Sequence, residues 1–200
     1  MWSAPLGSDP DQQRWSSAPD NEIPVAVPLN VVLARTEDLA LAVLGLQAYS
    51  SGIAFTLVGR VRPEAASRLP LVDAVWGSGD GRTLLLLGVE FADGRRASTA
   101  AGHGSSRDGL ILNPAGGAGS ETSVEQSWWV HPLPPEGPLR LVIRSDDLGV
   151  PESAVELDGA AIRAAGASVR ELWPWAAPRP EPLTPEPTRP DLPADSWFAS

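Results

Sequence analysis

LALAVLGLQAYSSGIAFTLVGRVR, residues 39–62, is the stretch of this chain that decides its fold. The turn-forming residues at 49–52 divide it into two halves, each as long as a strand. In the second half, Phe55, Leu57 and Val61 alternate with residues that point the other way. A period of two marks a strand with one buried face. The stretch therefore predicts a β-hairpin.

The first half of this hairpin is apolar at almost every position from Leu39 to Ala48. Two explanations remain open. Either both faces of the strand are covered, or a bulge near Val43-Leu44 changes which face is buried. In both cases we expect a central strand, because an edge or solvent-facing strand would carry more polar residues.

Further strand-like segments follow along the chain. Asp93-Gly94 is a two-residue hairpin turn, whereas the glycine-rich segment 101–121 is expected to be a loop. The other expected strands are Leu29–Thr36, Thr83–Phe91, Arg95–Ala100, Trp128–Val130 and Leu139–Ser145. This pattern predicts a mainly β chain, an antiparallel β-sandwich (Ig-like or jelly-roll-like) of about seven to eight strands.

The hydrophobic period changes near the end of this region. Asp158 can cap a helix, and Pro174 would end it. We therefore expect one C-terminal α-helix, at about 158–173, packed on the sandwich. The apolar positions that would face the sheet are Ile162, Ala165, Val169 and Leu172.

Composition divides the chain into three parts. Residues 1–22 are rich in Ser, Pro, Asp and Gln and are expected to form a disordered N-terminal tail. Residues 23–173 form the β-sandwich domain with its helix. Residues 174–200 contain frequent prolines and are expected to form an extended, disordered tail.

The chain is acidic, with a formal net charge of −10, and it contains no cysteine and no lysine. Nucleic-acid binding needs a positive surface, so no nucleic-acid partner is expected. The same charge disfavours an anionic membrane surface. Without cysteine there are no disulfides and no thiolate metal sites. The N-terminus has no basic and apolar signal pattern, so a cytoplasmic location is expected.

An ordered series of motifs runs through the second half of the domain. The series consists of Trp128-Trp129-Val130, Pro132-Leu133-Pro134-Pro135-Glu136-Gly137-Pro138-Leu139, Gly149-Val150-Pro151-Glu152, Leu157-Asp158-Gly159 and Leu172-Trp173-Pro174. It resembles a group of uncharacterised proteins from GC-rich, arginine-rich bacteria of the actinobacterial type. The resemblance covers residues 23–173 and implies a single bacterial sandwich domain, with no activity, ligand or partner attached.

Catalytic and metal-binding patterns are weak. His103 lies in a Gly-Ser segment and His131 lies at a strand end, but no strand–elbow–helix motif supplies a nucleophile. The carboxylates between Asp146 and Asp158 lack the spacing of a calcium loop. We therefore expect no catalytic residue, no metal site and no cofactor. A hydrolase based on His103 or on these carboxylates is the third hypothesis for the function.

Four arginines form a candidate binding surface. Two lie on one expected strand and two on another, so they could share the outer face of one sheet and receive a carboxylate or a phosphate. The alternative is cross-strand pairing with neighbours such as Glu90, which is commoner. The four residues are Arg60, Arg62, Arg140 and Arg144.

The chain contains eight tryptophans. The adjacent Trp128 and Trp129 must face opposite sides of their strand, so one is expected in the core and the other at solvent, under the helix or at a partner. In the proline-rich tail, Trp197 and Phe198 could anchor a protein partner.

The leading hypothesis is a non-enzymatic protein-interaction or assembly module. It would use an exposed Trp128 or Trp129 and the tail residues Trp197 and Phe198. The alternative is a small-molecule or carbohydrate-binding sandwich, with an aromatic platform and the outer arginines lining the site. The partner, the ligand and the oligomeric state remain open.

Overall fold

The computed structural model describes residues 14–77, 85–101 and 109–176. Within these ranges the chain forms eleven strands in three sheets, and every paired strand runs antiparallel to its neighbour. The prediction of a mainly β, antiparallel chain is therefore confirmed.

The larger sheet has five strands and contains the predicted hairpin. Its second and third strands are the two halves of residues 39–62, so the central place predicted for Leu39–Ala48 is confirmed. In spatial order the strands are β2 (Val25–Arg35), β3 (Leu39–Ala48), β4 (Ile53–Val61), β8 (Ser123–His131) and β7 (Ile111–Ser120).

The smaller sheet has four strands. In spatial order they are β10 (Val150–Asp158), β9 (Pro138–Ser145), β5 (Leu86–Glu90) and β6 (Arg96–Ser98). The Asp93-Gly94 turn joins β5 to β6, and Gly94 has a φ of +87°, as such a turn requires. A third sheet pairs β1 (Glu22–Ile23) with β11 (Arg170–Glu171).

Both large sheets contribute to one hydrophobic core. Leu41 and Phe55 enter it from the larger sheet, and Leu87 and Leu141 enter it from the smaller one. The two sheets also meet at an edge, where the Ser153 hydroxyl on β10 donates a hydrogen bond of 2.8 Å to the Leu33 carbonyl on β2. Burial of this shared apolar surface is the main force that holds the layers together.

Strand β7 corrects the expectation of a loop at 101–121. The glycines of this strand make room for a neighbour: a Cβ at Gly119 would lie 2.7 Å from the Trp76 ring, and one at Gly117 would lie 2.4 Å from the Glu125 carbonyl. Trp76 belongs to helix α2 (Leu71–Trp76), which follows the short helix η1 (Pro63–Arg68). A third short helix, η2, is Thr99–Ala101.

The count of about seven to eight strands is also too low, because β7, β10 and the two short strands β1 and β11 are not among the expected strands. The predicted helix at 158–173 is real but shorter: α3 spans Gly159–Gly166, and residues after it turn back to form β11. None of the helices in the described ranges is long and apolar enough to cross a lipid bilayer.

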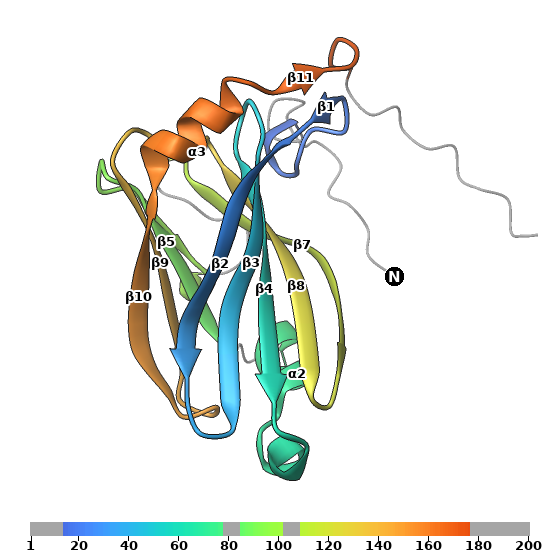
Figure 1. Cartoon of the computed structure of the whole chain (residues 1–200), viewed down its shortest axis with the longest axis vertical. Coiled ribbons are helices and arrows are strands. Elements are labelled where there is room, and N and C mark those ends of the chain that lie inside the picture. The colour runs from blue at the N-terminus through green and yellow to red at the C-terminus, as the bar shows by residue number, and fades with distance from the viewer. Residues whose placement is uncertain (1–13, 78–84, 102–108, 177–200) are drawn as a thin grey trace, which may run out of the picture.

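Helix α3 and the β1–β11 pair lie at the same end of the molecule, whereas α2 lies toward the opposite end (Figure 1). The segment 14–22, which we expected within a disordered tail, packs at the α3 end, where Asn21 is buried. Asn21 contacts the residues that follow α3. Two segments therefore meet at this end of the molecule: the N-terminal segment, residues 14–22, and the C-terminal segment, residues 167–176. The candidate site lies where these two terminal segments meet.

Candidate functional site

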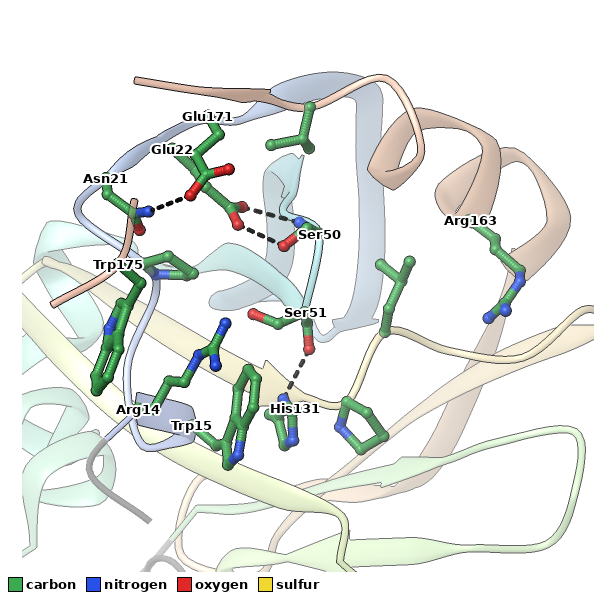
Figure 2. A pocket seen from close by; sticks show the side chains of 14 residues that line it. Arg14, Trp15, Asn21, Glu22, Ser50, Ser51, His131, Arg163, Glu171 and Trp175 are labelled. Atoms are coloured by element: carbon green, nitrogen blue, oxygen red, sulfur yellow. Dashed lines mark hydrogen bonds between the residues drawn. The ribbon is translucent and has the colours of Figure 1, made fainter. Parts of the chain in front are cut away.

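A pocket of about 620 Å³ lies where the two terminal segments meet the hairpin of β3 and β4 (Figure 2). Four parts of the chain contribute to it: the N-terminal segment, the turn after β3, the end of β8 and the segment from α3 onward. The lining residues are Arg14, Trp15, Pro19, Asn21, Glu22, Ser50, Ser51, His131, Pro132, Leu133, Arg163, Val169, Glu171 and Trp175.

The N-terminal segment is held on the outer face of the larger sheet by its own backbone. The Trp129 indole N–H donates to the Trp15 carbonyl at 2.9 Å, and the Asn113 side chain donates to the Ser16 carbonyl at 2.9 Å. Asn113 and Trp129 are paired residues on β7 and β8. The two bonds therefore fix the path of the segment across neighbouring strands.

Trp129 is buried on this outer face. The Tyr49 ring meets it edge-on at 5.5 Å between centroids, and a Cβ at Gly52 would lie 2.7 Å from the indole. Gly52 thus belongs to the turn for steric reasons, because any side chain there would collide with the tryptophan.

Arg14, Trp15, His131 and Trp175 form a stack along one side of the pocket (Figure 2). The Arg14 guanidinium lies 4.5 Å from the Trp15 ring centroid and 5.0 Å from that of Trp175. The opposite neighbour of Trp15 is His131, whose ring is nearly parallel to it at 4.8 Å. Cation–π attraction and ring stacking hold this row together.

The hydrogen bond of His131 to Ser51 determines which ring nitrogen is protonated. Its Nδ1 lies 2.7 Å from the Ser51 carbonyl oxygen, which can only accept, so Nδ1 is the protonated nitrogen. Burial lowers the pKa of His131 below its usual value, although the bond to Ser51 opposes this, and Arg95 adds to the lowering. The imidazole is thus neutral at pH 7, and its Nε2 offers a lone pair.

The wall opposite this stack is acidic and amide-lined. Glu22 accepts hydrogen bonds from the Ser50 backbone N–H at 2.9 Å and from the Ser50 hydroxyl. Asn21 donates to Glu171 at 3.3 Å and to the Trp173 carbonyl at 2.8 Å. These bonds join the two terminal segments across the mouth of the pocket.

Two buried oxygens of this wall lack a hydrogen-bond donor within the described part of the chain: Asn21 Oδ1 and Ser51 Oγ. Asn21 is only 3% exposed. A buried acceptor without a partner costs free energy.

Helix α3 brings Arg163 to the remaining side. The helix begins at Asp158, whose carboxylate accepts from the N–H groups of Ala160 and Ala161, so the predicted cap is confirmed. Ile162 anchors it in the core. Arg163 donates one hydrogen bond of 3.3 Å to the Pro134 carbonyl.

The four arginines predicted to share a face do not do so. Arg60 lies on β4 of the larger sheet, whereas Arg140 and Arg144 lie on β9 of the smaller sheet. Because the two strands belong to different layers, no common basic stripe exists. Arg62 follows β4 and lies by a shallow depression near the β2–β3 turn, away from the pocket.

Two of these arginines form the cross-strand ion pairs weighed as the alternative, and a third forms a local pair. Arg60 pairs with Glu125 at 2.5 Å, and Arg140 pairs with Glu90 at 2.7 Å. Arg144 pairs with Asp146 at 3.1 Å. These pairs are largely exposed and contribute little to stability.

Of the alternatives left open for the outward-facing tryptophan, the exposed Trp128 or Trp129 that the leading hypothesis uses is not what the structure has. Trp128 is 3% exposed and points into the core beside Phe55, while Trp129 is 1% exposed beneath the N-terminal segment. They do face opposite sides, as alternation requires, but both sides are covered. The tail residues Trp197 and Phe198 lie outside the described residues.

No arrangement of side chains in the described residues supports the hydrolase hypothesis. His103 lies outside the described residues, Asp158 caps α3, and Asp146 pairs with Arg144. Among the residues that the structure describes, no group of three or more His, Asp or Glu side chains is placed to hold a metal ion.

Sequence reasoning missed Arg14, Trp15, Asn21 and Arg163 as site residues. The signal that was present is Trp15, a large apolar side chain in an otherwise polar segment, because burial of such a side chain is favourable. Arg163 lies on the polar side of a predicted helix, and only the fold shows that this side borders a pocket.

We compared the chain with protein-family models, curated proteins and solved structures, and none of them matches it. The resemblance described for residues 23–173 therefore carries no family assignment, and the function has to be argued from the pocket itself.

Proposed function

We propose that this protein is a non-enzymatic binding module that takes a small organic ligand in the pocket between its terminal segments. The observation that carries the proposal is a pocket of about 620 Å³ that is lined by four charged side chains from separate parts of the chain: Arg14, Glu22, Arg163 and Glu171. Pockets of roughly 300–1,000 Å³ with a few convergent polar groups are typical of small-molecule sites.

The pocket favours a small molecule over a sugar bound by ring stacking. The Trp15 ring is stacked on His131 and covered by Arg14, so it offers no open aromatic platform (Figure 2). The proposal therefore keeps the small-molecule part of the alternative hypothesis. It places the binding site at the pocket between the terminal segments instead of at Trp129 and the outer arginines.

The test is a fragment screen by saturation-transfer NMR on the full chain, repeated on two variants. Val169→Trp would fill the pocket, because Val169 is a half-buried lining residue. Val32→Trp is the matched control, since Val32 is 57% exposed and outside the pocket. We expect bound fragments to lose their signal with Val169→Trp and keep it with Val32→Trp. Equal binding to both variants would refute the proposal.

We also assign the two large sheets to the β-sandwich class. The support is that four and five antiparallel strands contribute to a single core. Whether the topology is better described as Ig-like or jelly-roll-like stays a prediction, as does the cytoplasmic location.

Assembly with further copies of the chain is the second candidate function. The observation that favours it is a group of exposed apolar side chains on the paired terminal segments: Ile23 at 48%, Leu172 at 45% and Trp173 at 56% exposed. Leu172 and Asn21 are joined by a backbone hydrogen bond of 2.8 Å, so the two segments lie together. Sedimentation velocity should show concentration-dependent association that Trp173→Ser reduces. Association unchanged by this substitution, or a monomer at all concentrations, would refute it.

A further inference from the structure

The chemistry of the pocket wall narrows the class of ligand, on the condition that the proposed binding function holds. The first observation concerns arginine pairing. Six described arginines form ion pairs with carboxylates: Arg60, Arg68, Arg95, Arg96, Arg140 and Arg144. Neither arginine of the pocket, Arg14 or Arg163, has a carboxylate partner among the described residues, and the same is true of Arg35, Arg62 and Arg170 outside the pocket.

Both free guanidinium groups keep donors for a ligand. Arg14 is held face-on by the two tryptophan rings, and this contact leaves the N–H groups at its edge unused. Arg163 uses one of its five N–H donors on the Pro134 carbonyl. A planar, cationic donor fork of this kind matches a carboxylate best.

The second observation is a wall of hydrogen-bond acceptors. Its amide residue, Asn21, is buried and donates to Glu171 and to the Trp173 carbonyl. Beside it lie the carboxylates of Glu171, which accepts from Asn21, and Glu22, which accepts from Ser50. Figure 2 shows these three acidic and amide side chains together on one side of the pocket, away from Arg163. An ammonium group with three donors fits such a set of acceptors.

The third observation is charge balance. The charged residues that line the pocket are two arginines and two glutamates, and His131 is neutral. Their formal charges cancel, whereas the whole chain carries −10. A purely anionic ligand would meet two carboxylates and the repulsive field of the protein, and a purely cationic one would meet two guanidinium groups.

We infer that the pocket binds a zwitterion of amino-acid or dipeptide size. The carboxylate of the ligand lies at Arg163 and its ammonium group lies at Glu22 and Glu171. The apolar side chains of Pro132, Leu133 and Val169, which also line the pocket, surround the body of the ligand.

The experiment is isothermal titration calorimetry on the full chain with three matched probes. Leucyl-leucine carries both charges, N-acetyl-leucyl-leucine carries only the carboxylate, and leucyl-leucinamide carries only the ammonium group. We expect leucyl-leucine to bind at least tenfold more tightly than either single-charge probe. The acetylated probe has no ammonium group for the glutamates, and the amide probe has no carboxylate for Arg163.

Two substitutions test which residue binds the carboxylate of the ligand and which binds its ammonium group. Arg163→Gln should weaken leucyl-leucine and N-acetyl-leucyl-leucine while leaving leucyl-leucinamide unchanged. Glu171→Gln should weaken leucyl-leucine and leucyl-leucinamide while leaving the acetylated probe unchanged. Both residues are exposed, so the fold should tolerate the changes. Arg170→Gln and Glu136→Gln are matched controls, exposed and outside the pocket lining, and should change nothing.

The outcomes separate this inference from the proposed function. If all three probes bind alike and Val169→Trp blocks them, the pocket is a binding site but the zwitterion class is wrong. If fragments bind in the pocket while none of the dipeptide probes does, the class is again wrong. If Val169→Trp blocks the binding of neither the probes nor the fragments, both the zwitterion inference and the proposed binding function of the pocket are wrong.

Discussion

A single glycine sets how strand β3 presents its side chains. Leu39, Leu41 and Val43 are buried in alternation, Leu44 is exposed, and burial resumes at Leu46. The register with both neighbouring strands shifts around Gly45, whose φ is +62°. This bulge explains why the first half of the hairpin looks apolar throughout, and it lies just after the position near Val43-Leu44 that the sequence suggested.

Replacing this glycine tests the explanation. Gly45→Ala should lower the free energy of unfolding by about 1 kcal/mol, because a Cβ makes the left-handed backbone unfavourable even in open space. Gly88→Ala is the control, since its Cβ would lie 3.6 Å from that of Val142, an ordinary contact. Urea denaturation measures both. Equal losses for the two variants would contradict the role of Gly45.

His131 makes stability depend on pH. Its pKa in the folded chain is lowered, chiefly by burial, below the value of 6.5 in a free side chain. The unfolded chain therefore binds the proton more tightly, so this contribution to stability is complete above about pH 6.5 and is lost as the pH falls toward the folded pKa. The wild type should lose more stability than His131→Gln between about pH 7.5 and pH 5.5.

Urea denaturation at the two pH values measures this difference. The other groups with a shifted pKa do not interfere. Bonds to arginines lower the pKa values of Glu90 and Asp93, so these carboxyls titrate at more acidic pH, and burial raises the pKa of Tyr49, which titrates at alkaline pH. Parallel pH profiles for wild type and variant would contradict the assignment.

At the scale of elements, two of the places where sequence prediction failed have one cause. Strand β7 was expected to be a loop because glycine usually signals flexibility, yet Gly117 and Gly119 are there to let α2 and β8 approach. Helix α3 ends at Gly166, where a Cβ would lie 2.7 Å from Leu133 and 3.0 Å from the Tyr49 carbonyl. In each case a contact distant in sequence determines the choice of glycine.

The start of α3, in contrast, follows from local sequence. Asp158→Ala should destabilise the protein by about 1 kcal/mol, because two N–H groups of the first turn lose their acceptor. The exposed Asp147→Ala serves as control and should have little effect. Thermal or urea unfolding provides the measurement. Since α3 carries Arg163, the same variant should also weaken ligand binding; unchanged stability would show that the cap is not needed.

For the whole molecule, the main feature is the closure of one end by the two terminal segments. Strand β1 pairs with β11, Asn21 bonds to Glu171 and Trp173, and Arg14 lies between Trp15 and Trp175. The pocket exists only because these segments meet. Its walls come from residues as far apart as Arg14 and Trp175.

Shortening the N-terminal segment tests this closure. A chain that starts at residue 18 should be less stable, by about 2 kcal/mol, than one that starts at residue 14. It lacks the acceptors of the Trp129 and Asn113 hydrogen bonds, each worth about 1 kcal/mol. The longer chain is the reference, so any effect of the preceding residues cancels. Equal stability of the two chains would show that the segment is not part of the fold.

The sequence by itself determined the mainly β character, the antiparallel hairpin of β3 and β4, the Asp93-Gly94 turn and the cap at Asp158. These follow from periods of two and from local turn and cap chemistry, which act over a few residues. Only the tertiary structure decided that Trp129 is covered, that Arg60 and Arg140 lie in different layers, and that Arg14 meets Trp175. Those outcomes depend on which distant segments pack together, because burial and pairing are set by neighbours in space, about which a local pattern carries no information.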